Sequence, residues 1–193
     1  MSTIHPSLHP SLEVVCGPMF AGKTTLLIAR IEKASRAGTR VVACRPRADT
    51  RSQPDALTTH DGVSLPAVTV DGAGEIPGLA PGPGGLVVID EAHFFADGLI
   101  EPVRLLLERG VSVVVGGVDT DHRGRPFPPF PWLLCEADRV VKVRGVCAEC
   151  GGPSARSHRL GAGDVAIAVG GAESYRALCR GCFERVKGSP SLH

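Results

Sequence analysis

The sequence has almost no excess charge and no long hydrophobic run, and each absence excludes a class of partner. Its formal net charge is +1 over 193 residues, and no block of lysine and arginine is present that would neutralise a nucleic-acid backbone. No apolar run approaches the ~20 residues that a membrane-spanning helix needs. Residues 1–11 also lack the apolar segment of a signal peptide. We therefore expect a cytoplasmic protein that binds neither nucleic acid nor membrane.

A glycine-rich segment near the start of the chain is the most informative feature that is present. In a P-loop, backbone N–H groups converge on phosphate oxygens, a lysine lies near the β- and γ-phosphates, and a hydroxyl binds Mg²⁺. The segment predicts such a site for a nucleoside triphosphate, whereas the alternative, an ordinary glycine turn, leaves the Gly-Lys-Thr triplet unexplained. It matches every defined position of G-x-x-x-x-G-K-[ST], and its residues are Gly17, Pro18, Met19, Phe20, Ala21, Gly22, Lys23 and Thr24.

The flanking residues have the pattern that a P-loop requires. Leu12–Cys16 is a short apolar, β-branched run that predicts a strand. After Lys23, apolar residues recur at helical spacing until Gly38, which predicts a helix that ends there. The glycine-rich segment therefore joins a strand to a helix.

A second apolar run ends in two carboxylates. Residues 84–89 predict a buried parallel strand, and Asp90 and Glu91 follow it directly. Ligands collect at the carboxyl ends of such strands, and adjacent side chains on a strand point to opposite sides. We therefore expect Asp90 to bind Mg²⁺ together with Thr24, and Glu91 to accept a proton as the catalytic base. The alternative is a solvated strand end, since Asp-Glu pairs are common on surfaces.

Four cysteines near the C-terminus form two C-x₂-C pairs with 28 residues between them. Cys147, Cys150, Cys179 and Cys182 have the donor set of a closed, structural Zn²⁺ site, and a disulfide set or unrelated thiols are the alternatives. The spacer is rich in glycine and serine over residues 151–163 and predicts a loop that covers a ligand. The remaining cysteines, Cys16, Cys44 and Cys135, lie in or beside apolar runs, which favours a place in the core.

The strands and helices define the fold class. Further β-branched runs at 40–44 and 111–116 predict strands, and an apolar stripe over 99–107 predicts a helix that Gly110 ends. Alternation of strands and helices indicates an α/β fold, here a P-loop (RecA-like) parallel sheet with helices on both faces. The expected division is a flexible tail over 1–11, the nucleotide-binding domain over 12–143, a small zinc-binding domain with a ligand-covering loop over 144–186, and a second tail over 187–193.

Taken in order along the chain, these motifs resemble the cytosolic, zinc-containing (type II) thymidine kinases. The resemblance spans nearly the whole sequence. Its segments are Gly17–Thr25, Arg45-Pro46, Asp49–Arg51, Thr59–Gly62, Asp90–Phe95, Gly117–Asp119, Arg123–Phe127, the two C-x₂-C pairs, and Val169–Gly171 with Tyr175.

The resemblance implies ATP-dependent phosphorylation of the 5′-hydroxyl of thymidine, and also of deoxyuridine, in nucleotide salvage for DNA synthesis. It also implies a homotetramer, feedback inhibition by dTTP, and a lasso loop that binds the base largely through backbone groups. By motif position, the ATP site would include Asp49, Thr50, Arg51, Asp90, Glu91, Ala92 and His93. The nucleoside would contact Met19, Phe94, His122, Phe127, Ala166, Ile167, Ala168, Val169, Gly170 and Tyr175.

Two positions depart from the family pattern. His93 stands where the family has glutamine, and His122 stands where an aromatic phenylalanine packs on the base. An imidazole stacks or forms hydrogen bonds, but it is smaller and titrates near neutral pH. These two residues therefore affect base affinity and pH dependence.

Two other function classes remain open on the sequence alone. In a P-loop ATPase that acts on a partner, Glu91 would activate water, whereas a non-catalytic sensor would bind the triphosphate without transfer. Hydrolysis without an acceptor, or binding without turnover, would distinguish them. For further cationic support of the phosphates, Arg51 and Arg159 are candidates, against the alternative that both are solvated surface residues.

Overall fold

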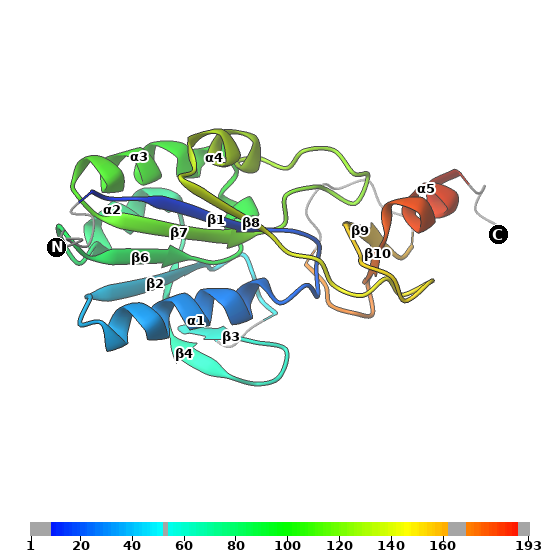
Figure 1. The fold of residues 1–193 in the computed structure, drawn as a ribbon, viewed down its shortest axis with the longest axis horizontal. Helices are drawn as coiled ribbons and strands as arrows, with labels where there is room; N and C mark the ends of the chain where they lie inside the picture. Colours follow the sequence, from blue (N-terminus) through cyan, green and yellow to red (C-terminus); the bar gives the residue numbers. More distant parts are fainter. Residues whose placement is uncertain (1–8, 52–53, 162–168, 189–193) are drawn as a thin grey trace, which may run out of the picture.

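The structure, a computed structural model, describes residues 9–51, 54–161 and 169–188. Its main feature is a six-stranded parallel sheet in the order β5-β2-β6-β7-β1-β8 (Figure 1). The strands are β1 (Leu12–Cys16), β2 (Val41–Pro46), β5 (Val68–Val70), β6 (Leu86–Ile89), β7 (Ser112–Gly117) and β8 (Arg139–Lys142).

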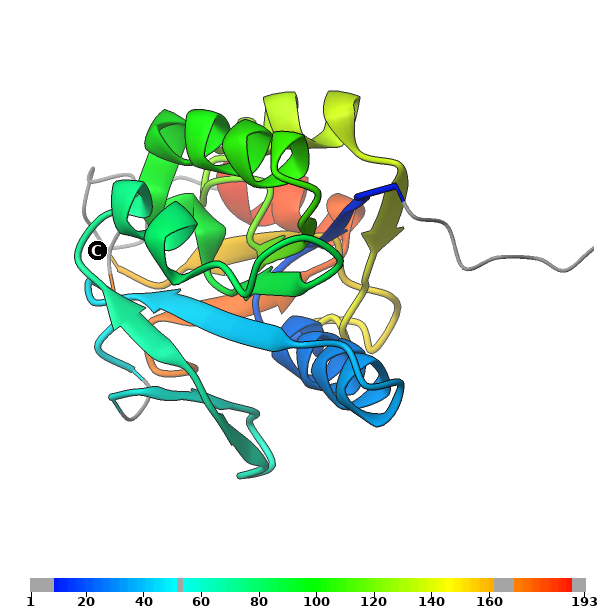
Figure 2. The same ribbon diagram turned by 90° about the vertical axis from the view of Figure 1, so that its left-hand side faces the viewer.

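Helices cover both faces of this sheet, as Figures 1 and 2 show. Side chains alternate along each strand, so that Val14 packs against one layer and Val15 against the other. Both faces are buried, which is why the central strands are apolar at nearly every position. One face carries α1 (Lys23–Arg36); the other carries η1 (Ala73–Glu75), α2 (Ile76–Leu79), η2 (Ala92–Leu99), α3 (Ile100–Glu108) and α4 (Phe130–Glu136).

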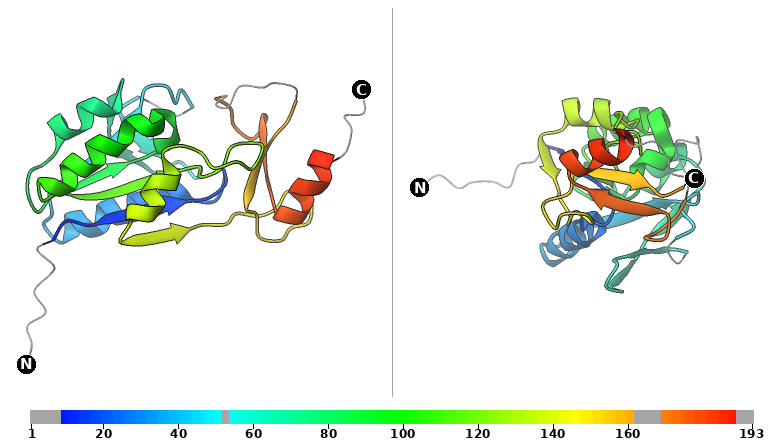
Figure 3. Two further views of the ribbon diagram at one scale, coloured as in Figure 1. Left: turned by 90° about the horizontal axis from the view of Figure 1, so that it is seen from above. Right: turned by 90° about the vertical axis from the view of Figure 1, so that its right-hand side faces the viewer.

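Two small antiparallel hairpins complete the fold. The first pairs β3 (Ala56–Thr58) with β4 (Ser64–Pro66). The second pairs β9 (Arg156–Arg159) with β10 (Tyr175–Leu178) and carries α5 (Arg180–Gly188). Figures 1 and 3 show this second unit beyond the carboxyl ends of the sheet strands. The sequence had indicated that the spacer between the cysteine pairs is a loop. In the structure the two ends of this spacer pair as β9 and β10, so it is not a loop throughout.

The predicted strands and helices of the sheet are confirmed, with shifts of one or two residues at their ends. The helix after the P-loop ends before Gly38, whose φ of 77° is the left-handed geometry that glycine adopts without strain. The expected tails lie partly outside the described residues, at 1–8 and 189–193. Among the described helices, none combines the length and the hydropathy that crossing a bilayer demands.

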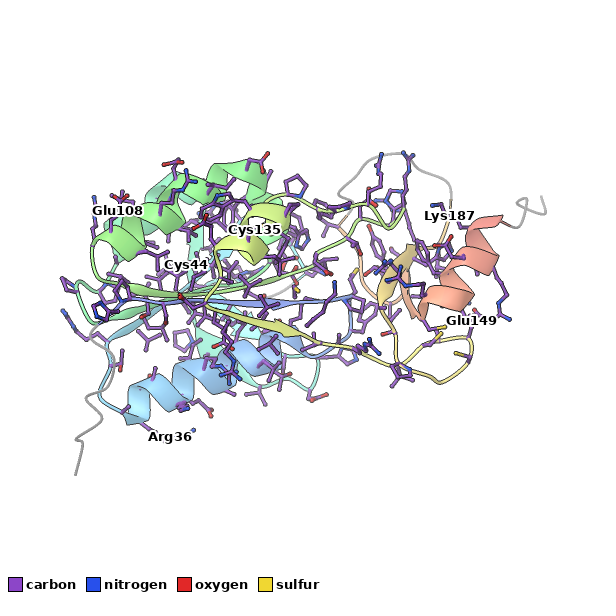
Figure 4. All side chains as sticks on the ribbon, turned by 45° about the horizontal axis from the view of Figure 1, so that its top comes forward. Arg36, Cys44, Glu108, Cys135, Glu149 and Lys187 are labelled. Carbon is purple, nitrogen blue, oxygen red and sulfur yellow. The ribbon has the colours of Figure 1, made fainter. Side chains whose placement is uncertain are left out.

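One interpretation of the cysteines is wrong. Cys16 and Cys44 are fully buried in the core, but Cys135 is exposed on α4 (Figure 4). The helix buries Phe130 and Leu133, and a residue two positions after Leu133 lies on a different side of the helix. An apolar neighbourhood in the sequence therefore did not decide which side of α4 faces the core.

Candidate active site

The carboxyl ends of the sheet strands open onto a cavity of about 800 Å³. The P-loop forms one wall and the β3–β4 hairpin another, and Gly171 and Ala172 reach it from the C-terminal unit. The sheet strands run from the end of the molecule that carries Arg36 and Glu108 towards the end that carries Glu149 and Lys187 (Figures 1 and 4). Residues that directly follow β1 and β6 line the cavity, so it lies at the edge where α/β sheets bind their ligands.

The backbone of the P-loop explains its glycines. Gly17 has a φ of 146°, and a Cβ atom there would lie 2.4 Å from the carbonyl oxygen of Val143. Gly22, directly before α1, has a φ of 77°. Lys23 is buried and its Nζ donates to the carbonyl oxygen of Pro18 at 2.7 Å. Burial lowers the pKa of Lys23, although the nearby carboxylates of Glu91 and Asp90 oppose this shift.

Thr24, in the first turn of α1, and Asp90, directly after β6, are brought together by the fold. The Thr24 hydroxyl donates to Asp90 Oδ2 at 2.9 Å, and the Glu91 N–H donates to Asp90 Oδ1 at 2.8 Å. Burial, followed by the charge of Glu91, raises the pKa of Asp90 to about 6. Two adjacent hard oxygen ligands, a hydroxyl and a carboxylate, fit Mg²⁺.

Glu91 leaves the strand in an unexpected geometry. β6 ends at Ile89, and Glu91 has a φ of 50°, so a turn and not strand alternation separates the two carboxylates. Glu91 Oε1 lies 2.8 Å from Arg51 Nη2, whereas Oε2 is buried and has no hydrogen-bond partner among the described residues. Burial raises the pKa of Glu91, but the positive charges near it outweigh this effect and lower the pKa: that of His93 at the low pH where its imidazole is protonated, and those of Arg51 and Lys23. Glu91 is thus ionised at neutral pH.

A chain of buried charges holds Arg51 against Glu91. Asp49 Oδ1 accepts from Arg51 Nε at 2.6 Å, and Asp49 also pairs with Arg45 at 3.3 Å. The side chains of Arg45 and Asp49 are only 3% and 4% exposed. The sequence analysis gave Arg45 no role in the site. Its only signal was its position directly after the predicted strand over 40–44, and in the structure it belongs to β2.

His93 is neutral at physiological pH. Burial lowers its pKa to about 4, although the charge of Glu91 opposes this shift. Its Nδ1 accepts from the Val118 N–H at 3.4 Å and lies 3.5 Å from Glu91 Oε2. Since a neutral Nδ1 that accepts a hydrogen bond carries no proton, it cannot donate to the carboxylate. His93 therefore leaves Glu91 Oε2 unpaired.

A smaller cavity of about 40 Å³ adjoins the first, and Met19 and Arg51 line both. Arg159, expected near the phosphates, instead has its guanidinium 5.6 Å over the Tyr175 ring and its Nη2 3.1 Å from the Tyr175 hydroxyl. Six of the residues expected to contact nucleoside line the small cavity, namely Met19, Phe94, His122, Phe127, Val169 and Tyr175.

The four cysteines of the C-x₂-C pairs meet as expected. Their Sγ atoms all lie within 4.8 Å of one another, and Cys150 and Cys179 are 3.7 Å apart. All four are free thiols, which disfavours the disulfide alternative. Zn–S bonds of about 2.3 Å in a tetrahedron place sulfurs about 3.8 Å apart, so this cluster fits Zn²⁺.

The remaining predicted residues are placed differently. Gly17 and Pro18 shape the P-loop without lining either cavity, and Thr50, Ala92 and Gly170 also line neither. Ala166, Ile167 and Ala168 lie outside the described residues. His93 lines the small cavity. The other expected ATP-site residues line the large cavity, namely Met19, Phe20, Ala21, Gly22, Lys23, Thr24, Asp49, Arg51, Asp90 and Glu91.

The fold is a parallel sheet with a P-loop after β1, two carboxylates after the next strand but one in the sheet, and a separate four-cysteine unit. These features define the class of P-loop nucleotide-binding proteins. The family model described as thymidine kinase matches residues 10–183. The chain belongs to the thymidine kinase family. Membership makes this chain an enzyme whose class of reaction is nucleoside phosphorylation.

Curated relatives are similar over most of their length. A thymidine kinase of Bacteroides thetaiotaomicron is 40% identical over 177 residues, covering 92% of this chain and 88% of the relative. A thymidine kinase of Roseiflexus sp. is 38% identical over 182 residues, covering 90% of this chain and 94% of the relative. A thymidine kinase of Bdellovibrio bacteriovorus is 37% identical, with coverages of 94% and 89%.

Among solved structures, the genome packaging NTPase B204 of Sulfolobus turreted icosahedral virus 2, in complex with ATP-gammaS, is similar to this chain. The TM-score is 0.46 at 12% identity, covering 69% of this chain and 74% of the other. At this level of likeness nothing about function follows.

Proposed function

We propose that the protein transfers the γ-phosphate of ATP to the 5′-hydroxyl of thymidine, and also of deoxyuridine, in salvage of nucleotides for DNA synthesis. Family membership supports nucleoside phosphorylation. The particular nucleosides are inferred from the family name and from the two adjoining cavities, one suited to a triphosphate and one lined largely by apolar and aromatic side chains.

The observation that carries this proposal is the state of Glu91. Its Oε2 is buried, ionised at neutral pH and without a hydrogen-bond partner among the described residues, while Arg51 holds the other oxygen. Leaving a buried acceptor unpaired costs about 1–3 kcal/mol. A substrate hydroxyl that donates to Oε2 would recover this energy and would already be placed for proton transfer.

The reaction then needs alignment and charge neutralisation more than covalent chemistry. P-loop amides and Lys23 bind the phosphates, and Arg51 adds positive charge at the boundary of the two cavities. The proton of the 5′-hydroxyl passes to Glu91 Oε2 as the hydroxyl oxygen attacks the γ-phosphorus and ADP leaves. A bound Mg²⁺ would neutralise charge on the phosphate oxygens, and Thr24 and Asp90 would hold it.

The four cysteines would hold a structural Zn²⁺, since a closed set of thiolates leaves no open position for substrate. Reduced thiols agree with a cytoplasmic protein.

A homotetramer and feedback inhibition by dTTP are further parts of the proposal that rest on the family resemblance alone. The boundary between the nucleotide-binding domain, which ends at residue 143, and the cysteine-containing domain, which begins at residue 144, also stays a prediction.

The test is transfer of radiolabelled γ-phosphate from ATP and Mg²⁺ to a panel of nucleosides, beside a control without acceptor. We expect product with thymidine and deoxyuridine, and none with purine nucleosides. Transfer confined to another nucleoside would overturn the substrate and keep the mechanism. Phosphate release without an acceptor would favour a partner-driven ATPase, and ATP binding without any turnover would favour a sensor.

A further inference from the structure

Two buried polar atoms at the small cavity have no hydrogen-bond partner among the described residues. Thr120 Oγ1 and His122 Nδ1 are both buried atoms, and neither forms a hydrogen bond within residues 9–51, 54–161 and 169–188. Both residues line the same cavity of about 40 Å³. They are two positions apart in the segment that follows β7, so one short stretch of chain presents both groups.

The other polar residues that line the small cavity do contact other protein groups. Ser157, Asp121, Tyr175, His93 and Arg51 also line the cavity, and each contacts another protein group. The Ser157 hydroxyl, for example, accepts from the Met19 N–H at 2.9 Å. Unpaired buried polar groups each cost about 1–3 kcal/mol. Two of them at one cavity therefore point to a partner from outside the protein, water in the empty site and a ligand in the occupied one, that completes their hydrogen bonds.

The chemistry of the two groups limits the ligand. A threonine hydroxyl is uncharged, and the pKa of His122 is lowered by burial and by the charge of Arg159, which leaves the imidazole neutral at pH 7. Apolar and aromatic side chains, among them Met19, Phe94 and Phe127, form much of the remaining wall. A flat, uncharged heterocycle with hydrogen-bonding groups at its edge fits these walls.

We infer that Thr120 and His122 form a side-chain hydrogen-bonding pair that binds the edge of the pyrimidine base and contributes to base selectivity. The inference rests on the proposed function, because it concerns the same nucleoside site. It adds direct side-chain recognition to a pocket in which the family resemblance implies recognition through backbone groups. A cavity of about 40 Å³ has no room for a whole pyrimidine base, so the inference requires the surrounding side chains to move apart when a base enters.

Thr120→Val tests the hydroxyl because valine keeps the shape and removes the polar atom. We expect the KM for thymidine to rise roughly five- to tenfold, the effect of one lost hydrogen bond, with kcat and the KM for ATP within about twofold. The melting temperature without ligand should stay unchanged or rise, since an unpaired hydroxyl is lost. Thr120→Ser keeps the hydroxyl and should restore the KM, and Thr39→Val at the far end of α1 is the matched control.

His122 is tested by two replacements. Phenylalanine keeps a flat ring without nitrogen, and we expect His122→Phe to raise the KM for thymidine roughly five- to tenfold. Asparagine places a polar atom close to the position of Nδ1, so His122→Asn should recover most of the affinity. An unchanged or lower KM in His122→Phe would assign the position to stacking and overturn the pair.

The remaining outcomes are also decisive. A Thr120→Val protein with unchanged KM, or with a lower melting temperature and no change in thymidine binding, would show that the hydroxyl serves the fold and would overturn the inference. In those cases the wild-type protein still phosphorylates thymidine. A wild-type protein that transfers phosphate to no pyrimidine nucleoside would instead overturn the proposed function, and the inference with it.

Discussion

At the scale of single residues, the site depends on which buried polar atoms have partners. Arg51 forms an ion pair with one oxygen of Glu91. Asp49 contacts both Arg51 and Arg45, and so fixes the position of Arg51. The other oxygen of Glu91 has no partner among the described residues. One carboxylate is thus fixed in position by an arginine and still has an oxygen available for a substrate proton.

Glu91→Gln tests the proposed base. Glutamine keeps the size and still accepts from Arg51 but cannot take a proton, so kcat should fall by about 10²–10⁴, the usual contribution of a positioned base. The affinity for ATP should change little, as measured by equilibrium binding. Glu108→Gln, on the exposed end of α3, is the control. A Glu91→Gln protein with a kcat within about threefold of wild type would exclude this role.

Arg51→Gln tests the electrostatics of the same carboxylate. The base must be ionised, so activity is lost as the pH falls through the pKa of Glu91, which Arg51 helps to lower. Without Arg51 the effect of burial gains weight, the pKa rises, and the acid limb of the pH profile of kcat/KM should move to higher pH. Arg47→Gln, which removes an exposed pair with Asp71, should leave the limb in place. An unmoved limb in Arg51→Gln would contradict the assignment.

At the scale of elements, the C-terminal hairpin contacts the P-loop. Ser157 in β9 accepts from the Met19 N–H, and Ser154 accepts from the Gly145 N–H at 3.0 Å. The hairpin itself lies between the two cysteine pairs and has only two strands, which are marginally stable in isolation. A metal at the cysteines would therefore stabilise the wall of the nucleoside cavity.

Replacement of one cysteine of the cluster tests the proposed structural zinc. Cys150→Ser should lower the bound zinc well below one per chain, lower the melting temperature, and raise the KM for thymidine more than the KM for ATP. Cys135→Ser is the matched control, because Cys135 is an exposed cysteine on α4 that lies outside the cluster. Metal analysis and thermal unfolding measure the effect. A metal-free protein of native melting temperature would contradict a structural zinc.

At the scale of the whole molecule, charge is concentrated at one edge of the sheet. Lys23, Asp90 and Asp49 are all at least 93% buried there, although the chain as a whole is nearly neutral. Buried charges are costly unless they are paired. Within the described residues, Asp49 is paired with Arg45 and Arg51, whereas Lys23 and Asp90 are hydrogen-bonded only to uncharged groups. A polyanionic ligand with its cation would bring opposite charges to Lys23 and Asp90, so binding should stabilise the entire fold.

The stabilisation can be measured by thermal unfolding. At a concentration of ATP and Mg²⁺ near 100 times the dissociation constant, the free energy of unfolding should rise by about 2.7 kcal/mol, or roughly 5–11 °C for a chain of this size. Lys23→Ala should lose most of this shift, whereas Lys33→Ala, exposed in the last turn of α1, should keep it. An equal shift in both variants would refute the placement of Lys23 at the phosphates.

The sequence by itself determined the features whose chemistry is local. The P-loop, the carboxylates after β6 and the cysteine pairs each need particular residues at fixed short spacing, and the alternation of buried strands with helices follows from hydrophobic pattern. The tertiary structure decided what depends on contacts between distant segments. It paired Arg45 with Asp49, exposed Cys135 and placed the Arg159 guanidinium against Tyr175. It also left Thr120 Oγ1 and His122 Nδ1 without a hydrogen-bond partner in the part of the chain that the structure describes. Such outcomes depend on packing between strand ends that lie far apart in the chain, and no local pattern in the sequence carries them.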